Sequence, residues 1–193
     1  MARHNVVRKI KNRTTIILVM LLISIMVSWV IWGNLSVETT KLTVTSKDLP
    51  EAFDKFSIAH ISDLHNAEYG KNNEKLIDIL EAESPNIIAI TGDLIDSNHT
   101  NLEVALSFAQ QAVKIAPCYF VTGNHEAWIG SQYEELKTSL QNTGITVLQD
   151  EAIELNYGDV CIQLIGLNDP DFSERDRLLS ESILEAKLSQ VNI

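Results

Sequence analysis

The chain has 193 residues, a length that predicts one globular domain in addition to whatever its N-terminus forms. Its formal net charge is −11, and because five basic and no acidic residues stand among the first fifteen, the remainder carries −16. A body this acidic argues against binding nucleic acid through the phosphate backbone, so no nucleic-acid partner is expected. The two cysteines, Cys118 and Cys161, form neither a zinc motif nor a disulfide framework, and we expect both to be small core residues.

The first apolar segment, residues 14–32, contains no charged residue. At about 1.5 Å of helix rise per residue, it is long enough to span a bilayer. Because residues 1–13 are basic, the positive-inside rule predicts a cytoplasmic tail, a single-pass anchor in the cell membrane and an extracytoplasmic domain. Trp29 and Trp32, at the outer end of the segment, are expected at the membrane interface. The alternative is a cleaved signal peptide, although no A-x-A site follows the apolar run.

A short polar tether is expected at residues 33–40, and the domain at residues 41–193 alternates apolar runs with segments of helical periodicity. We predict strands over 56–62, 86–91, 118–121, 145–148, 152–155 and 160–167, and helices over 73–82, 102–115, 133–142 and 173–190. Gly144 is placed to end the third of these helices. Strands that alternate with helices predict an α/β fold with a mainly parallel sheet and helices on its faces.

Three polar clusters follow three of the predicted strands. They are SDLH, with Asp63 and His65; TGDLID, with Asp93; and TGNHE, with Asn124, His125 and Glu126. Asp93 lies 30 residues after Asp63, and Asn124 lies 31 residues after Asp93. Because a strand–helix–strand unit takes roughly 30 residues, each cluster falls one unit after the last. The three clusters are therefore expected to meet at the carboxyl edge of the sheet, where open α/β sheets form their sites.

Two carboxylates, an imidazole and an amide oxygen form a suitable ligand set for a divalent metal ion. The mixture of oxygen and nitrogen donors favours Mn²⁺, Fe or Zn²⁺ over Ca²⁺, which takes oxygen alone. Asp63 and His65 are two residues apart, so they point the same way from an extended segment. Asp93 is able to bridge two ions through its two oxygens. Two ions roughly 3.5–4 Å apart would clamp a phosphoryl centre and generate hydroxide near neutral pH.

The motifs D-x-H at 63–65, G-D at 92–93 and G-N-H-E at 123–126, in this order and spacing, resemble those of the calcineurin-like metallophosphoesterase family. The resemblance covers about residues 41–170, and the apolar N-terminal segment is similar to that of the family's membrane-anchored bacterial branch. It implies a layered α/β sandwich of the metallophosphoesterase type, of which this chain would hold the N-terminal part. It also implies a hydrolase that uses two divalent ions to cleave a phosphomonoester or phosphodiester.

The resemblance also implies roles for individual residues. Asp63 and His65 would hold the first metal, Asp93 would bridge the two ions, and Asn124 would hold the second. His125 would stabilise the transition state or protonate the leaving oxygen. Glu126 is expected to orient His125. An anchored site near a bilayer suggests a lipid-linked or nucleotide-sugar lipid substrate.

The chain departs from the family pattern in its histidines. The family completes its site with further histidines downstream, whereas none follows His125 in this sequence. The second metal site is therefore expected to be incomplete, and the domain to be incomplete at its C-terminus. An alternative function follows from this, namely a catalytically impaired, membrane-tethered remnant that acts by binding. A nuclease of the same fold is disfavoured by the acidic charge.

The remaining chemistry-bearing residues are interpreted structurally. His60 falls inside the first strand and is expected in the core, and His99, in a polar loop, is expected in solvent. Asp96 is expected to help the loop after Asp93 turn, and the run 168–171 is expected to form a turn. Trp128 is expected either to line the site or to cover its rim.

Overall fold

The computed structural model describes residues 2–173 and 183–189. It divides into a unit over residues 1–38 and a second unit over residues 39–193. The helix predicted over 173–190 is described in part: α7 (Ile183–Leu188) is helical, and residues 174–182 and 190 lie outside the described residues.

The first unit is the helix α1 (Ala2–Leu35), which contains the predicted span. Residues Arg13–Gly33 have a mean hydropathy of 2.6 and none of them is buried within the protein, so by length and composition the helix is able to cross a membrane. A signal sequence has the same properties. The helix continues to Leu35, so the first residues of the predicted tether are helical, and the chain is irregular from Ser36 to Thr45.

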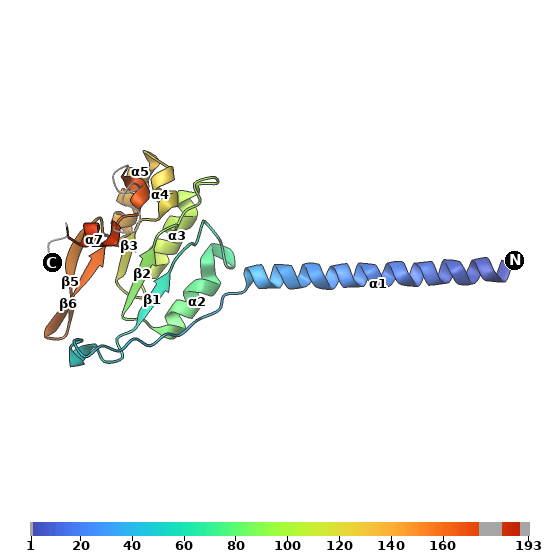
Figure 1. Ribbon diagram of the computed structural model, residues 1–193, viewed down its shortest axis with the longest axis horizontal. Helices are drawn as coiled ribbons and strands as arrows, with labels where there is room; N and C mark the ends of the chain where they lie inside the picture. Colours follow the sequence, from blue (N-terminus) through green and yellow to red (C-terminus); the bar gives the residue numbers. More distant parts are fainter. Residues whose placement is uncertain (1, 174–182, 190–193) are drawn as a thin grey trace. The chain divides into compact units, whose positions relative to one another are not determined.

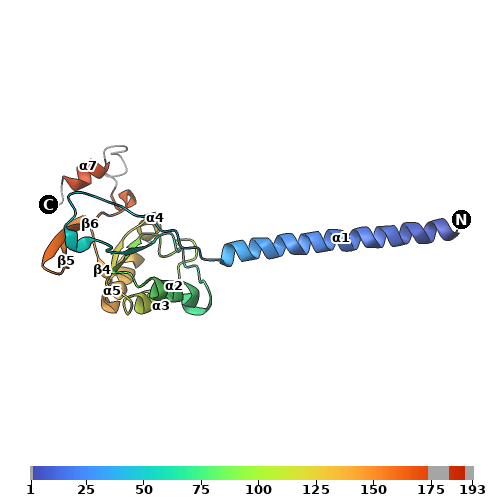
Figure 2. The same cartoon turned by 90° about the horizontal axis from the view of Figure 1, so that it is seen from below.

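The domain is built on a four-stranded parallel sheet in the order β1-β2-β3-β4. Its strands are β1 (Ile58–Ile61), β2 (Ile87–Thr91), β3 (Cys118–Val121) and β4 (Thr146–Val147). The connecting helices are α2 (Glu74–Glu83), α3 (Leu102–Ala112) and α5 (Gln132–Thr143), preceded by the short α4 (Asn124–Trp128). Right-handed crossovers in this strand order place α2, α3 and α5 side by side on one face (Figures 1 and 2).

The start of α3 and the end of α5 follow from local sequence. Asn101 caps α3, since its side chain accepts a hydrogen bond from the backbone N–H of Glu103. Gly144 ends α5 with φ at 101°, as predicted, because glycine enters the left-handed region without a steric cost.

The core between sheet and helices is formed by alternate residues of β2 and β3 together with apolar helix residues. Ile88, Ile90, Phe108, Phe120 and Leu136 are all at most 1% exposed.

An antiparallel hairpin, β5 (Glu151–Tyr157) and β6 (Val160–Gly166), forms a separate two-stranded sheet. It contributes to a second core around the buried residues Phe53, Ile87 and Leu155, against which Tyr119 of β3 also packs. Phe53 lies in the short helix η1 (Glu51–Phe53), and two further single turns are η2 (Lys71–Asn73) and η3 (Pro170–Phe172). The structure thus has the layered α/β form that the sequence indicated.

Two burial predictions are wrong. His60 is exposed, because it shares an outward face of β1 with Ile58, and its Nε2 lies 2.6 Å from Oγ1 of Thr91. Cys161 is exposed because β6 alternates and places it on the solvent side, whereas Cys118 is buried as expected. Position within a strand predicts only an alternation, and the packing of neighbouring layers decides which of its two faces is covered.

Candidate metal centre and active site

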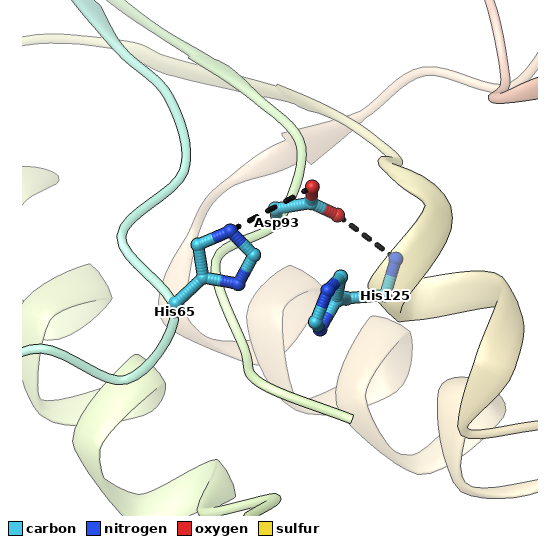
Figure 3. A group of neighbouring side chains, drawn as sticks. All are labelled: His65, Asp93 and His125. Atoms are coloured by element: carbon cyan, nitrogen blue, oxygen red, sulfur yellow. Dashed lines mark hydrogen bonds and ion pairs between the residues drawn. The ribbon is translucent and has the colours of Figure 1, made fainter. Parts of the chain in front are cut away.

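The three polar clusters meet at the carboxyl edge of the parallel sheet. His65 Nε2 lies 3.9 Å from Oδ2 of Asp93, and Oδ1 of Asp93 accepts a 2.9 Å hydrogen bond from the backbone N–H of His125. The rings of His65 and His125 meet edge to face, with centroids 4.4 Å apart. Figure 3 shows the three side chains converging from three different segments. Each offers one ligand atom, and these atoms all lie within 4.8 Å of one another.

Of the other predicted ligands, Asp63 lies close to His65, and Asn124 directly precedes His125 in the chain. Oδ1 of Asp63 is 3.7 Å from Nε2 of His65, and its Oδ2 accepts a hydrogen bond from the Ser62 hydroxyl. The Asp63 side chain is 65% exposed, so it lies at the solvent side of the site. Asn124 is half-buried and is the first residue of α4, directly before His125.

The backbone at the site adopts conformations that side chains normally avoid. Asp63, His65 and Asp93 have φ values of 54°, 46° and 50°. A non-glycine residue in this left-handed region costs roughly 1–2 kcal/mol. The cost is offset where the N–H groups of Asp63 and His65 donate to the carbonyl oxygens of Gly92 and Asp93, at 3.2 and 2.8 Å. Strain of this kind concentrates at functional sites, where surrounding structure holds the residues in place.

Two glycines bring the second and third clusters into contact. A Cβ on Gly92 would lie 2.6 Å from Cα of Gly123, and a Cβ on Gly123 would lie 2.6 Å from the backbone nitrogen of Asp93. Gly92 also has φ at 87°. Neither position has room for a side chain, so both glycines are needed for Asp93 to reach the start of α4.

Glu126 is a fully buried carboxylate that joins the same two segments. Its Oε2 accepts from the N–H groups of Gly123 and Asp93 at 2.7 and 2.8 Å, and its Oε1 accepts from Leu94 and Ile95 at 2.9 and 3.3 Å. Burial raises the pKa of Glu126, and the N–H donors oppose that shift. The hydrogen bond from Gly123 satisfies the backbone N–H of the residue directly before α4.

The prediction that Glu126 orients His125 is wrong. Nδ1 of His125 accepts a 2.9 Å hydrogen bond from the N–H of Ser97 and lies 3.5 Å from Oδ1 of Asp96. Because Nδ1 is an acceptor, the neutral imidazole carries its proton on Nε2. A hydrogen bond from the Asn98 N–H holds the pKa of Asp96 below its usual value, so Asp96 is charged beside the ring.

Asp96 is the site residue that sequence reasoning missed. It does help its loop to turn, since it accepts from Asn98, but it also approaches His125. The only signal in the sequence was its position three residues after Asp93. His99 is exposed as predicted, with its Nδ1 3.5 Å from Asp96.

Trp128 lies at the rim of the site. Its ring centroid is 4.9 Å from that of His125, with 40° between the planes, and its Nε1–H donates a 2.6 Å hydrogen bond to Asp171. Asp171 belongs to η3, which confirms the turn predicted at 168–171. The same turn is fixed beside β3, because the N–H of Asp169 donates to Oγ1 of Thr122 at 3.1 Å.

Comparison with known proteins agrees with this geometry. The sequence profile of the family described as calcineurin-like phosphoesterase matches residues 56–190, which include all three clusters. The chain belongs to the calcineurin-like phosphoesterase family. Similar proteins are the uncharacterized metallophosphoesterase YkoQ of Bacillus subtilis, 28% identical over 137 residues, and an uncharacterized metallophosphoesterase of Aquifex aeolicus, 29% identical over 136. YkuE of Bacillus subtilis, also an uncharacterized metallophosphoesterase, is 26% identical over 164 residues.

These alignments cover 69%, 68% and 79% of this chain, but 50%, 49% and 56% of the three relatives. The chain therefore spans about half the length of the curated relatives it matches. The resemblance that the motifs indicated is confirmed at the level of the family and of the α/β fold.

This calcineurin-like phosphoesterase domain has donors that fit the divalent ions the family implies. A carboxylate and two imidazoles within 4.8 Å of one another match the oxygen and nitrogen ligands of Zn²⁺, Mn²⁺ or Fe. The sequence placed His125 at the leaving group, whereas the structure places it in one group with His65 and Asp93. The two roles exclude each other at Nε2, because a ring nitrogen that carries a proton has no lone pair for a metal ion.

Replacing Glu126 with glutamine tests how the site is held together. An amide NH₂ would face two backbone N–H donors whichever way the side chain is turned, leaving buried donors unsatisfied. We expect the free energy of unfolding to fall by at least about 1–3 kcal/mol, measured by urea denaturation of the full chain in detergent. The matched control is Glu81→Gln on the exposed surface of α2, which should change it by no more than about 0.5 kcal/mol. Equal stability of the two variants would contradict this role for Glu126.

Proposed function

We propose that this domain hydrolyses phosphate esters with the help of divalent metal ions bound at the carboxyl edge of its sheet. The observation that carries the proposal is the convergence of His65, Asp93 and His125 from three separate segments, in a family of metal-dependent phosphoesterases. The substrate is a phosphomonoester or a phosphodiester. An anchored domain would act on esters at the bilayer surface, which favours a lipid-linked phosphate or a nucleotide-sugar lipid.

In this proposal Asp63, His65 and Asp93 hold a first ion, and Asp93 and Asn124 contribute to a second. The distances of 3.7 and 3.9 Å from His65 Nε2 to the two carboxylates support the first set, since small shifts would bring all three donors around one ion. The second set has fewer donors and is expected to bind more weakly. A bound divalent ion would supply Lewis acidity, which lowers the pKa of water and neutralises charge on a phosphoryl group.

His125 acts at the leaving oxygen. The N–H of Ser97 occupies Nδ1, so the Nε2–H is the donor that faces the leaving oxygen and stabilises the negative charge that develops there. Oδ1 of Asp96 lies 3.5 Å from the same Nδ1, so two neighbouring residues of one loop contact this nitrogen. The ring of Trp128 is a neighbour of the His125 ring, with centroids 4.9 Å apart.

A change of Asp93 tests the metal-dependent activity. Asp93→Asn is expected to lower manganese-stimulated hydrolysis of an aryl phosphodiester by at least about 100-fold, since even residues that only support metal ligands cost 10- to 100-fold. It should also weaken Mn²⁺ binding in calorimetric titration. Asp78→Asn, on the exposed face of α2, is the matched control and should change neither. If the unmodified chain neither turns over nor binds Mn²⁺ tightly, the alternative of a non-catalytic remnant that acts by binding is supported instead.

The role of His125 is tested with two leaving groups. His125→Asn is expected to lower kcat/KM by about 10²–10⁴ for an alkyl phosphate ester, but much less for p-nitrophenyl esters, whose leaving group needs no proton. His99→Asn is the control, because that side chain is 88% exposed. An equal loss with both leaving groups, accompanied by weaker Mn²⁺ binding, would show that His125 serves as a metal ligand and not as the acid.

We further propose that α1 anchors the protein in the cell membrane, with residues 1–13 cytoplasmic and the domain outside. The apolar stretch of 21 residues and the basic residues before it support this orientation. The protein is expected to stay in the membrane after an alkaline carbonate wash. Protease added to intact spheroplasts should remove the domain and spare an N-terminal tag. A mature chain whose N-terminus begins after residue 32 would indicate a cleaved signal peptide instead.

A further inference from the structure

Trp128 has a combination of features that packing does not explain. It is a large aromatic side chain, yet it is 54% exposed. It is also fixed: its Nε1–H is bound to Asp171 at 2.6 Å, and its ring lies against His125. An exposed tryptophan that packs only for stability would gain more by burying its surface. Here the polar edge of the indole is satisfied while much of the ring still faces solvent.

The position of this ring relates it to one part of a substrate. His125 is the residue that faces the leaving oxygen in the proposed reaction, and Trp128 is its ring neighbour, with centroids 4.9 Å apart. The ring of His65 also meets that of His125 edge to face, and Asp93 accepts a hydrogen bond from the backbone N–H of His125. A leaving group whose oxygen reaches His125 therefore also comes near the indole.

Only certain leaving groups gain from such a surface. A flat indole held in place can stack on a planar aromatic group. Any nucleic-acid base can bind in this way, because every base has a π face. An aliphatic alcohol such as glycerol or a bare sugar has no matching face. Charge does not supply the selectivity, because glycerol, a sugar and a nucleoside are all uncharged leaving groups.

We propose that Trp128 is a specificity-determining residue, which selects phosphate esters whose leaving group carries a planar aromatic ring, such as a nucleoside. The inference rests on the proposed function, because it assigns the leaving-group side of that same site. Asp171 is the positioning residue, because its carboxylate accepts the hydrogen bond from the indole N–H of a side chain that is 54% exposed. The reaction is unchanged: the P–O bond to the leaving group breaks, water supplies the new oxygen, and the leaving oxygen takes a proton.

The test uses a matched pair of probes, AMP and ribose 5-phosphate, together with their methyl phosphodiesters. Both carry the same phosphate on a primary 5′-oxygen and differ at C1′, which bears adenine in AMP and a hydroxyl in ribose 5-phosphate. With Mn²⁺, the wild-type chain is expected to favour the adenosine ester in kcat/KM by roughly five- to hundredfold. Trp128→Leu should lose most of this preference, and Trp128→Phe should keep most of it. Tyr157→Leu, a partly exposed aromatic at the end of β5, is the control and should retain it.

A second measurement does not depend on turnover. The chain has three tryptophans, so replacing Trp29 and Trp32 with phenylalanine leaves Trp128 as the only indole. AMP is expected to quench its fluorescence at lower concentration than ribose 5-phosphate does, and Asp171→Leu should weaken that difference. Circular dichroism checks that each variant is folded.

The outcomes separate this inference from the proposed function. If both esters are hydrolysed and Trp128→Leu slows them equally, Trp128 is only a wall of the site and the inference is overturned while the function stands. If neither ester is hydrolysed but AMP selectively quenches Trp128, the proposed function fails and the binding surface is supported. Equal quenching by the two probes would overturn the inference directly.

Discussion

The site depends on one buried carboxylate. Glu126 accepts four backbone N–H groups, two on each oxygen, and so joins the segment after β2 to the segment after β3. A carboxylate is the side chain best able to do this, because it accepts at both oxygens and donates at neither. Desolvation of its charge is costly, and the cost is met by concentrating four donors in one place. The position of Asp93, and through Asp93 the approach to His65 and to the N–H of His125, follows from this arrangement.

The other site residues are held in place by backbone conformations that are themselves unfavourable. Three of the candidate site residues hold positive φ values, and Gly92 and Gly123 are too close for either to carry a side chain. Hydrogen bonds between segments, not regular secondary structure, maintain these conformations. The rearrangement required on binding an ion or a substrate is correspondingly small, which is the condition under which fixed donors contribute most to catalysis.

Electrostatics explain why cations are central to the proposed activity. The body of the chain carries −16, and Asp63, Asp93 and Asp96 all lie at the edge of the sheet where a phosphate ester would bind. An anionic substrate would be repelled from such an edge in the absence of compensating charge. Divalent ions would reverse the sign of the local potential, and the same carboxylates would then hold the ions that attract the phosphate.

The sequence by itself determined the order of strands and helices and the edge at which the polar clusters meet. The intervals of 30 and 31 residues match one strand–helix–strand unit each, and the apolar runs report burial along each strand. Only the tertiary structure decided that Glu126 supports Asp93 and not His125, that Asp96 is the neighbour of His125, and that His60 and Cys161 face solvent. Periodicity describes the two faces of a single element. Contacts between loops depend on individual backbone angles, and the choice of which face is covered depends on the layer packed against it, so neither is encoded in spacing along the chain.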